Sequence, residues 1–153
     1  MKNLAKGIIC LSVFFIAIQA NAQTLPVREP EMNRPSMFLD LPQKIEVPLI
    51  NLSILLQSEM GKPVTFPFTE NVIFQGVVTS LASSDDNSVK SVVIKSTNFN
   101  GAVFSFSRII KEDGVSTYVG RILSFQHGDA YEINMENGRY YFVKKSFYDL
   151  VNE

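Results

Sequence analysis

The residue best suited to acid–base chemistry is His127, the single histidine of the chain. Histidine is the commonest general base, and a serine–histidine–acid triad would have to use it, with Asp129 or Asp113 orienting the ring. The sequence contains no Gly-x-Ser-x-Gly nucleophile elbow. The surrounding Gln126-His127-Gly128-Asp129 is typical of a polar turn. We therefore interpret His127 as a turn residue and keep a small hydrolase as an alternative.

Metal ligation has little support in the residue types present. A zinc site needs three or four His, Cys or carboxylate ligands, and the chain has one His and one Cys. Calcium takes oxygen ligands, and the densest group of side-chain oxygens is Asp85-Asp86-Asn87. This group lacks the acid spacing of an EF-hand loop, so we interpret it as a solvated turn. No phosphate loop or dinucleotide fingerprint is present, and we expect no metal and no cofactor.

Aromatic side chains beside cations are the stronger binding signal. The chain has 12 Phe and 5 Tyr but no Trp. In an extended strand Tyr140-Tyr141-Phe142 must place successive rings on opposite faces, and Lys144 and Lys145 follow. An exposed ring beside a cation can stack a sugar or anchor a protein. A half-covered edge strand whose lysines deter aggregation is the alternative. The candidate ligand- or partner-binding residues are Tyr118, Arg121, His127, Tyr140 and Tyr141.

The elements that must position these residues are strands. Alternation of apolar and polar residues predicts strands at 64–68, 72–81, 89–96, 102–110, 116–125, 130–135 and 139–144. Asn137-Gly138 is the strongest turn signal, because both central residues of a type I′ turn need positive φ. We predict a mainly β fold, an antiparallel meander of about seven strands that forms a sandwich or a partly closed barrel. Short connections make sequential strands neighbours.

The residues that flank the meander are less clear. Residues 45–49 alternate like a strand, while Leu52 and Leu55 have helical spacing, so we expect a short strand and then a short helix after Pro48. Residues 146–151 fit either a strand or a short helix. Gly76, in the middle of an expected strand, indicates a bulge or a close approach of another backbone.

The first 22 residues have the features of a secretory signal peptide. Lys2 and Lys6 precede an apolar run at 7–18, and Ala20-Asn21-Ala22 fits the small-x-small rule for cleavage after Ala22. The apolar run is short for a membrane span. We expect the mature chain to begin at Gln23, to be periplasmic or secreted, and to contain no membrane span.

Residues 23–43 are expected to form a flexible leader ahead of a single β-rich domain at 44–153. Four of the seven prolines lie in the leader, and proline blocks helix. Its apolar cluster, Met37-Phe38-Leu39, is expected to dock on the domain. Loss of residues 1–22 removes two lysines and no acid, so the net charge changes from −1 to −3. No cysteine remains, and the charge argues against nucleic acid as a partner.

Several short motifs between residues 74 and 142 resemble the β-rich propeptide modules that precede the catalytic domain of some secreted zinc metalloproteases. They are Phe74-Gln75-Gly76-Val77-Val78, the valine-rich 89–94, Gly120-Arg121-Ile122, Tyr131-Glu132-Ile133 and Tyr140-Tyr141-Phe142. The resemblance implies binding to a protease, masking it or assisting its folding. The chain contains no His-Glu-x-x-His motif and no cysteine after Cys10 that could occupy a zinc ion.

These observations favour a secreted, non-catalytic binding module that engages another exported protein, with a propeptide-like or inhibitor-like role as the sharpest form. The partner is then an exported protein, such as a protease. Binding of a carbohydrate or small ligand through the 140–142 strand, with Tyr118 and Arg121, is the first alternative. A small hydrolase and a structural surface component are the others.

Overall fold

A computed structural model describes residues 34–151, and these form eight strands and two short helices. The predicted signal peptide at 1–22 and the first part of the predicted leader, 23–33, lie outside the described residues. The elements, in chain order, are β1 (Lys44–Glu46), α2 (Leu49–Leu55), β2 (Pro63–Pro67), β3 (Ile73–Ser83), β4 (Val89–Ser96), β5 (Val103–Ile110), β6 (Ser116–Leu123), β7 (Asp129–Glu136), β8 (Arg139–Ser146) and α3 (Phe147–Val151).

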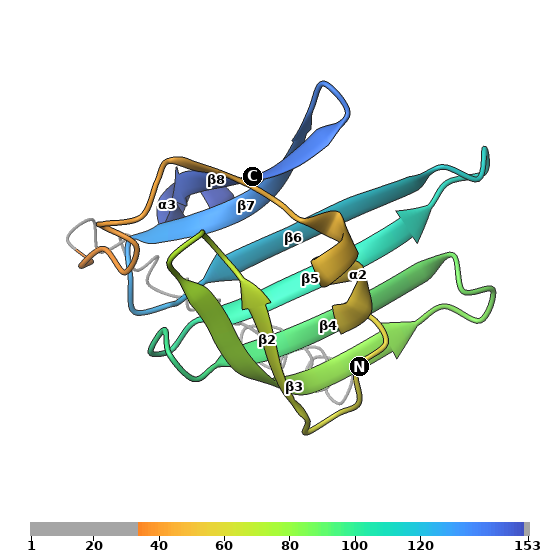
Figure 1. Cartoon of the computed structure of the whole chain (residues 1–153), viewed down its shortest axis with the longest axis horizontal. Coiled ribbons are helices and arrows are strands. Elements are labelled where there is room, and N and C mark those ends of the chain that lie inside the picture. The colour runs from red at the N-terminus through yellow and green to blue at the C-terminus, as the bar shows by residue number, and fades with distance from the viewer. Residues whose placement is uncertain (1–33, 152–153) are drawn as a thin grey trace, which may run out of the picture. The chain divides into compact units, whose positions relative to one another are not determined.

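All eight strands belong to one antiparallel sheet in the order β1-β8-β7-β6-β5-β4-β3-β2. Strands β2 to β8 follow one another as a meander, and β1 is added at the far edge, against β8. The sheet curls into a half-barrel, and α2 lies over its hollow side (Figure 1). The prediction of a mainly β, antiparallel meander is confirmed. Of the two predicted forms, the structure has the partly closed barrel.

Local sequence explains the tight turns and the close strand contacts. Asn137 and Gly138 have φ of 51° and 78° and join Glu136 to Arg139 in a two-residue hairpin, as the Asn-Gly signal predicts. A Cβ added at Gly76 would lie 2.7 Å from the Lys95 carbonyl oxygen, so this glycine marks a close approach of β4. The short helix after Pro48 and the helical form of residues 147–151 are both present.

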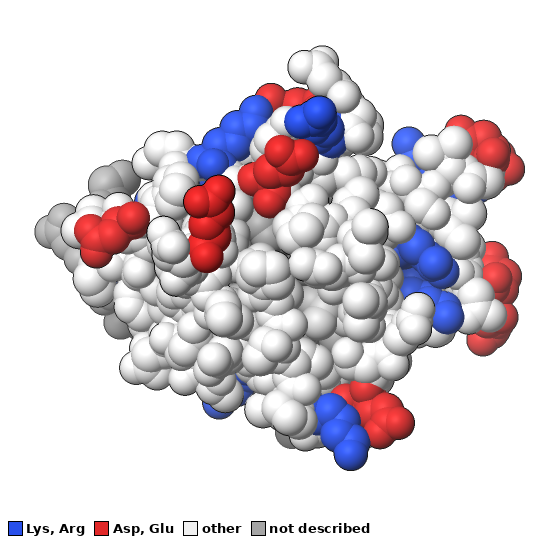
Figure 2. Space-filling view, in the orientation of Figure 1, with Lys and Arg blue, Asp and Glu red and all other residues white. Residues whose placement is uncertain are grey.

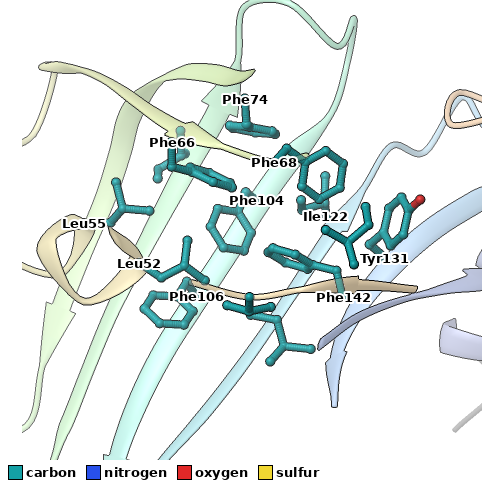
Figure 3. Close-up of a cluster of buried hydrophobic side chains, with 14 of the residues drawn as sticks. Leu52, Leu55, Phe66, Phe68, Phe74, Phe104, Phe106, Ile122, Tyr131 and Phe142 are labelled. Carbon is teal, nitrogen blue, oxygen red and sulfur yellow. The ribbon is translucent and has the colours of Figure 1, made fainter. Parts of the chain in front are cut away.

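The hollow side of the sheet is filled with aromatic rings. Phe66 from β2, Phe104 from β5 and Phe142 from β8 converge there, and their ring centroids lie 5.3 to 6.4 Å apart (Figure 3). Leu52 and Leu55 of α2 point into the same cluster and are buried. Because β2 and β8 lie near opposite edges of the sheet, contact between their rings shows how far the sheet has curled.

The last part of the predicted leader packs on this core. Phe38 is 1% exposed, and its ring lies 5.1 Å from that of Tyr131. The buried carboxylate of Asp129 accepts hydrogen bonds from the backbone N–H groups of Met37 and Phe38, at 2.6 and 2.8 Å. The Lys144 ammonium donates to the Phe38 carbonyl from the other side. Met37 and Phe38 of the predicted apolar cluster therefore pack on the domain, whereas Leu39 is exposed.

Candidate functional site

The structure brings together two of the five candidate residues. Tyr118 of β6 and Tyr140 of β8 both face the hollow side, with ring centroids 5.6 Å apart and perpendicular planes. Tyr140 is 7% exposed, and its hydroxyl accepts a hydrogen bond from the Tyr118 backbone N–H. Tyr118 also stacks on Phe106 at 5.8 Å. Tyr140 is therefore part of the hydrophobic core, and Tyr118 packs against that core.

Arg121 and Tyr141 lie on the opposite, outer face of the sheet. The Arg121 guanidinium binds the Glu132 carboxylate at 2.9 Å and approaches the Leu150 carbonyl of α3. Tyr141 pairs in register with Asn134 and carries the Lys44 ammonium 4.0 Å from its ring centroid. Successive rings of β8 therefore do point to opposite faces, as the sequence predicts.

The outer face is hollowed where β6 and β7 separate. These strands pair only over three residues, from Arg121 to Leu123 on β6, whereas β5 and β6 pair over eight. A hollow of about 420 Å³ lies at this split, with polar groups from Ser105, Ser107, Arg121, Glu132 and Asn134 in its wall. Gly120 lies in the wall of this hollow, and a Cβ there would lie 2.8 Å from the Ser105 carbonyl oxygen.

His127 does not meet either acid proposed to orient it. Its Nδ1 lies 3.0 Å from the Ser124 hydroxyl, while Asp129 is engaged with the backbone of Met37 and Phe38. Ser124 is 1% exposed, so its hydroxyl is closed to a substrate. The His127–Ser124 contact holds the turn between β6 and β7.

Asp86 is occupied by hydrogen bonds within its turn. Its carboxylate accepts from the hydroxyls of Ser84 and Ser88 and from the Ser88 backbone N–H. These bonds lower the pKa of Asp86 from 3.8 to about 2. Across residues 34–151 no three His, Cys, Asp or Glu side chains gather in a way that could hold a metal ion.

A second hollow lies along the seam where the half-barrel stays open, between β1 and β2. It has a volume of about 520 Å³, within the range of pockets that bind ligands. One wall consists of residues 42–48, and the other of residues 67–70. Ile45, Val47 and Phe68 are buried and form an apolar floor. Within the described chain, β1 and β2 are the two edge strands of the sheet.

The face that contains this seam is uncharged at its centre. Figure 2 shows charged side chains around its margin and none over the middle, where Figure 1 places α2 and β2. The sequence from Val47 to Ser58 contains no charged residue. Ile50 and Ile54 lie one turn apart on α2 and are 79% and 59% exposed. Neighbouring exposed apolar side chains form part of an interaction surface when they belong to a contiguous apolar patch.

Neither the seam nor this uncharged face was among the sequence candidates. The sequence did contain a signal for this face. Apolar side chains lie on every side of the helix, whereas a helix that packs on one core buries only one face. These residues are Leu49, Ile50, Leu52, Ile54 and Leu55. The prolines at 42, 48, 63 and 67 bracket both edge strands, and proline in a strand is typical of an edge.

Compared with protein-family models, with curated proteins and with solved structures, the chain matches none of them. The fold and the two hollows are therefore the basis of any functional proposal. No helix within residues 34–151 is long and apolar enough to cross a membrane.

Proposed function

We propose that this chain is an exported, non-catalytic binding module that engages another exported protein through the uncharged face, formed by α2 and β2, together with the seam at its margin. The observation that carries the proposal is the exposure of Ile50 and Ile54 at the centre of that face. Their contact with water is unfavourable, and a partner that covers them gains about 25 cal/mol for each Å² of apolar surface buried.

The composition of this face fits a protein partner. The buried centre of a protein interface is depleted in charged residues, and its rim is polar. Here the centre is uncharged and the charges lie at the margin (Figure 2). Leu52 and Leu55 fix α2 to the core from below, so Ile50 and Ile54 are presented on a supported element.

A propeptide-like or inhibitor-like role is the sharpest form of this proposal. The motifs between residues 74 and 142 support it by their resemblance to metalloprotease propeptides. With no cysteine after Cys10 and no cluster of metal-binding side chains in the described residues, such an inhibitor would act by covering a surface of the protease. It would not act by ligating the protease's zinc ion.

The experiment is a pull-down in which the tagged chain from Gln23 to Glu153 captures partner proteins from the secreted and envelope fraction, and mass spectrometry quantifies them. The Ile54→Lys variant places a charge at the centre of the uncharged face. The control is Val115→Lys, because Val115 is 55% exposed, close to the 59% of Ile54, but lies in the turn between β5 and β6. We expect one stoichiometric partner, lost with Ile54→Lys and retained with Val115→Lys. Equal capture by both variants contradicts the proposal.

Binding of a carbohydrate or small polar ligand is the second candidate, and the hollow at the split between β6 and β7 favours it. Glu132 and Asn134 offer acceptors and donors for hydroxyl groups, and Tyr141 lies beside Asn134 on the same face. A glycan array with wild type and Tyr141→Ala tests this function. A glycan bound by the wild type alone would support it, and an array without signal would exclude it for the glycans present.

A further inference from the structure

The main-chain N–H and C=O groups of β1 point alternately toward β8 and toward the seam. The Lys144 N–H donates to the Gln43 carbonyl, and the Val47 N–H donates to the Tyr140 carbonyl, both at 2.8 Å. Residues 43, 45 and 47 are thus the ones bonded to β8. Because these bonds alternate along an antiparallel strand, the N–H and C=O groups of Lys44 and Glu46 face the seam.

The opposite edge of the seam has few donors for the β1 carbonyl groups. On β2, Phe68 donates to Val72 and the Lys62 carbonyl accepts from Val78, so the even-numbered residues bond to β3. Pro63, Thr65 and Pro67 therefore face the seam, and proline has no N–H. β2 offers a single donor at its centre. β2 therefore has acceptors but not the donors of a regular ladder with β1, and no backbone hydrogen bond joins the two strands in the part of the chain that the structure describes. Two donors and two acceptors of β1 remain open.

We infer that the seam takes an extended segment of the partner polypeptide, which pairs with β1 as an added strand. An open row of N–H and C=O groups is the recognition element of strand addition. The floor beneath it is Ile45, Val47 and Phe68, so every second side chain of the incoming segment must be apolar. The prolines at 42 and 48 limit the length to about five residues.

The charges of β1 do not select the segment, because they are already paired, and the other charged residue in the wall of the hollow is Glu70 on the opposite side. Lys44 binds Glu136, and Glu46 lies 3.6 Å from Arg139. The partner class is therefore defined by conformation and by alternate apolar side chains, as in a flexible tail or an unfolded stretch of an exported protein. This inference rests on the proposed function and names the form of the partner that the same face takes.

The test is an NMR titration of the ¹⁵N-labelled chain from Gln23 to Glu153. The probe is the peptide acetyl-KVTVTVK-amide, in which alternate valines can enter the seam and the lysines give solubility. We expect the largest amide shifts at Lys44 and Glu46. The control peptide acetyl-KVPVPVK-amide retains the valines but lacks two main-chain donors, and we expect at least tenfold weaker binding.

Three variants separate the main chain from the side chains. Lys44→Pro removes an N–H that makes no bond to β8, and Lys44→Ala removes the side chain but keeps that N–H. Thr65→Pro removes the single donor of β2. We expect Lys44→Pro to weaken peptide binding at least tenfold and the other two variants to bind within about twofold of wild type. Glu46→Pro repeats the test at the second donor if Lys44→Pro does not fold by circular dichroism.

Each contrary result has a defined meaning. Equal binding by Lys44→Pro and Lys44→Ala, or loss of binding with Thr65→Pro alone, overturns pairing with β1. If the wild type is a dimer in sedimentation velocity and Lys44→Pro is a monomer, a second copy of the chain occupies the seam. That result would also overturn the inference. If Ile54→Lys abolishes capture of the natural partner but Lys44→Pro does not, strand addition fails and the proposed function stands. If wild type captures no partner, the proposed function fails, whatever the peptide does.

Discussion

Truncation of Phe38 tests whether the segment before β1 is part of the folded domain. A flexible leader would contribute nothing to stability, so Phe38→Ala would leave the unfolding transition unchanged. The structure instead buries Phe38 to 1% exposure, with Phe99 and Tyr131 at ring distances of 5.5 and 5.1 Å. The neighbouring Leu39 is 75% exposed and provides a matched control in the same segment.

The expected cost follows from this burial. Replacement of a buried Phe by Ala costs about 3 to 5 kcal/mol, and the aromatic neighbours place Phe38 in the upper part of that range. The 118 residues from 34 to 151 predict a total stability of about 6 to 18 kcal/mol. The variant should therefore fold but unfold earlier. Leu39→Ala should cost less than about 0.5 kcal/mol.

Urea denaturation followed by tyrosine fluorescence and far-ultraviolet circular dichroism measures this difference. With a slope of about 1.5 to 2 kcal/mol per M, Phe38→Ala lowers the midpoint by about 2 to 3 M. Leu39→Ala moves it by less than about 0.4 M. If both variants unfold at the same urea concentration, the segment carries no stability and its packing against the core is refuted.

Three further predictions concern single residues. In Gly120→Ala the new Cβ would meet the Ser105 carbonyl oxygen at 2.8 Å, so thermal unfolding should show a loss of about 1 to 3 kcal/mol. Tyr131→Phe removes the hydroxyl that donates to the Pro42 carbonyl, and urea unfolding should show a loss of about 1 to 2 kcal/mol. The pKa of Asp86 should be about 2 by NMR titration, and its stabilising contribution should be present above about pH 4 and lost as the pH falls toward 2. A midpoint near 3.8 would contradict the hydrogen bonds of that turn.

The meander could be predicted because its determinants are local. Alternation along each strand and the Asn137-Gly138 turn require only neighbouring residues, and they gave the order of the strands. The same alternation placed Tyr140 and Tyr141 on opposite faces. It could not say which of them points inward, because that depends on the partner across the sheet. Tyr140 turns to the hollow side, where it meets Tyr118 from a strand 22 residues away.

The candidate site was harder to predict because its parts meet only through distant contacts. His127 and Asp129 are close in sequence, which left a catalytic pair open as an alternative, but Asp129 binds the backbone of Phe38, 91 residues away. The seam lies between two edge strands that come to face each other only after the sheet has curled. No local pattern records which strands become edges. The prolines at 42, 48, 63 and 67 are evident in the sequence, but they indicate the seam only once β1 and β2 are known to be the edge strands.

The position of β1 at the far edge of the sheet has a consequence for the order in which the protein folds. β1 pairs with β8, the last strand, and the backbone of Met37 and Phe38 binds Asp129 of β7. The segment at the N-terminal end of the domain therefore needs partners that the ribosome synthesises last. A chain that emerges N-terminus first can build its hairpins one by one from β2 onward, each through contacts between neighbours in sequence. The closing step brings together residues about 90 to 100 apart, and such distant pairings form slowly. Until then residues 34–47 have no place to dock, and the apolar floor of the seam has not yet formed.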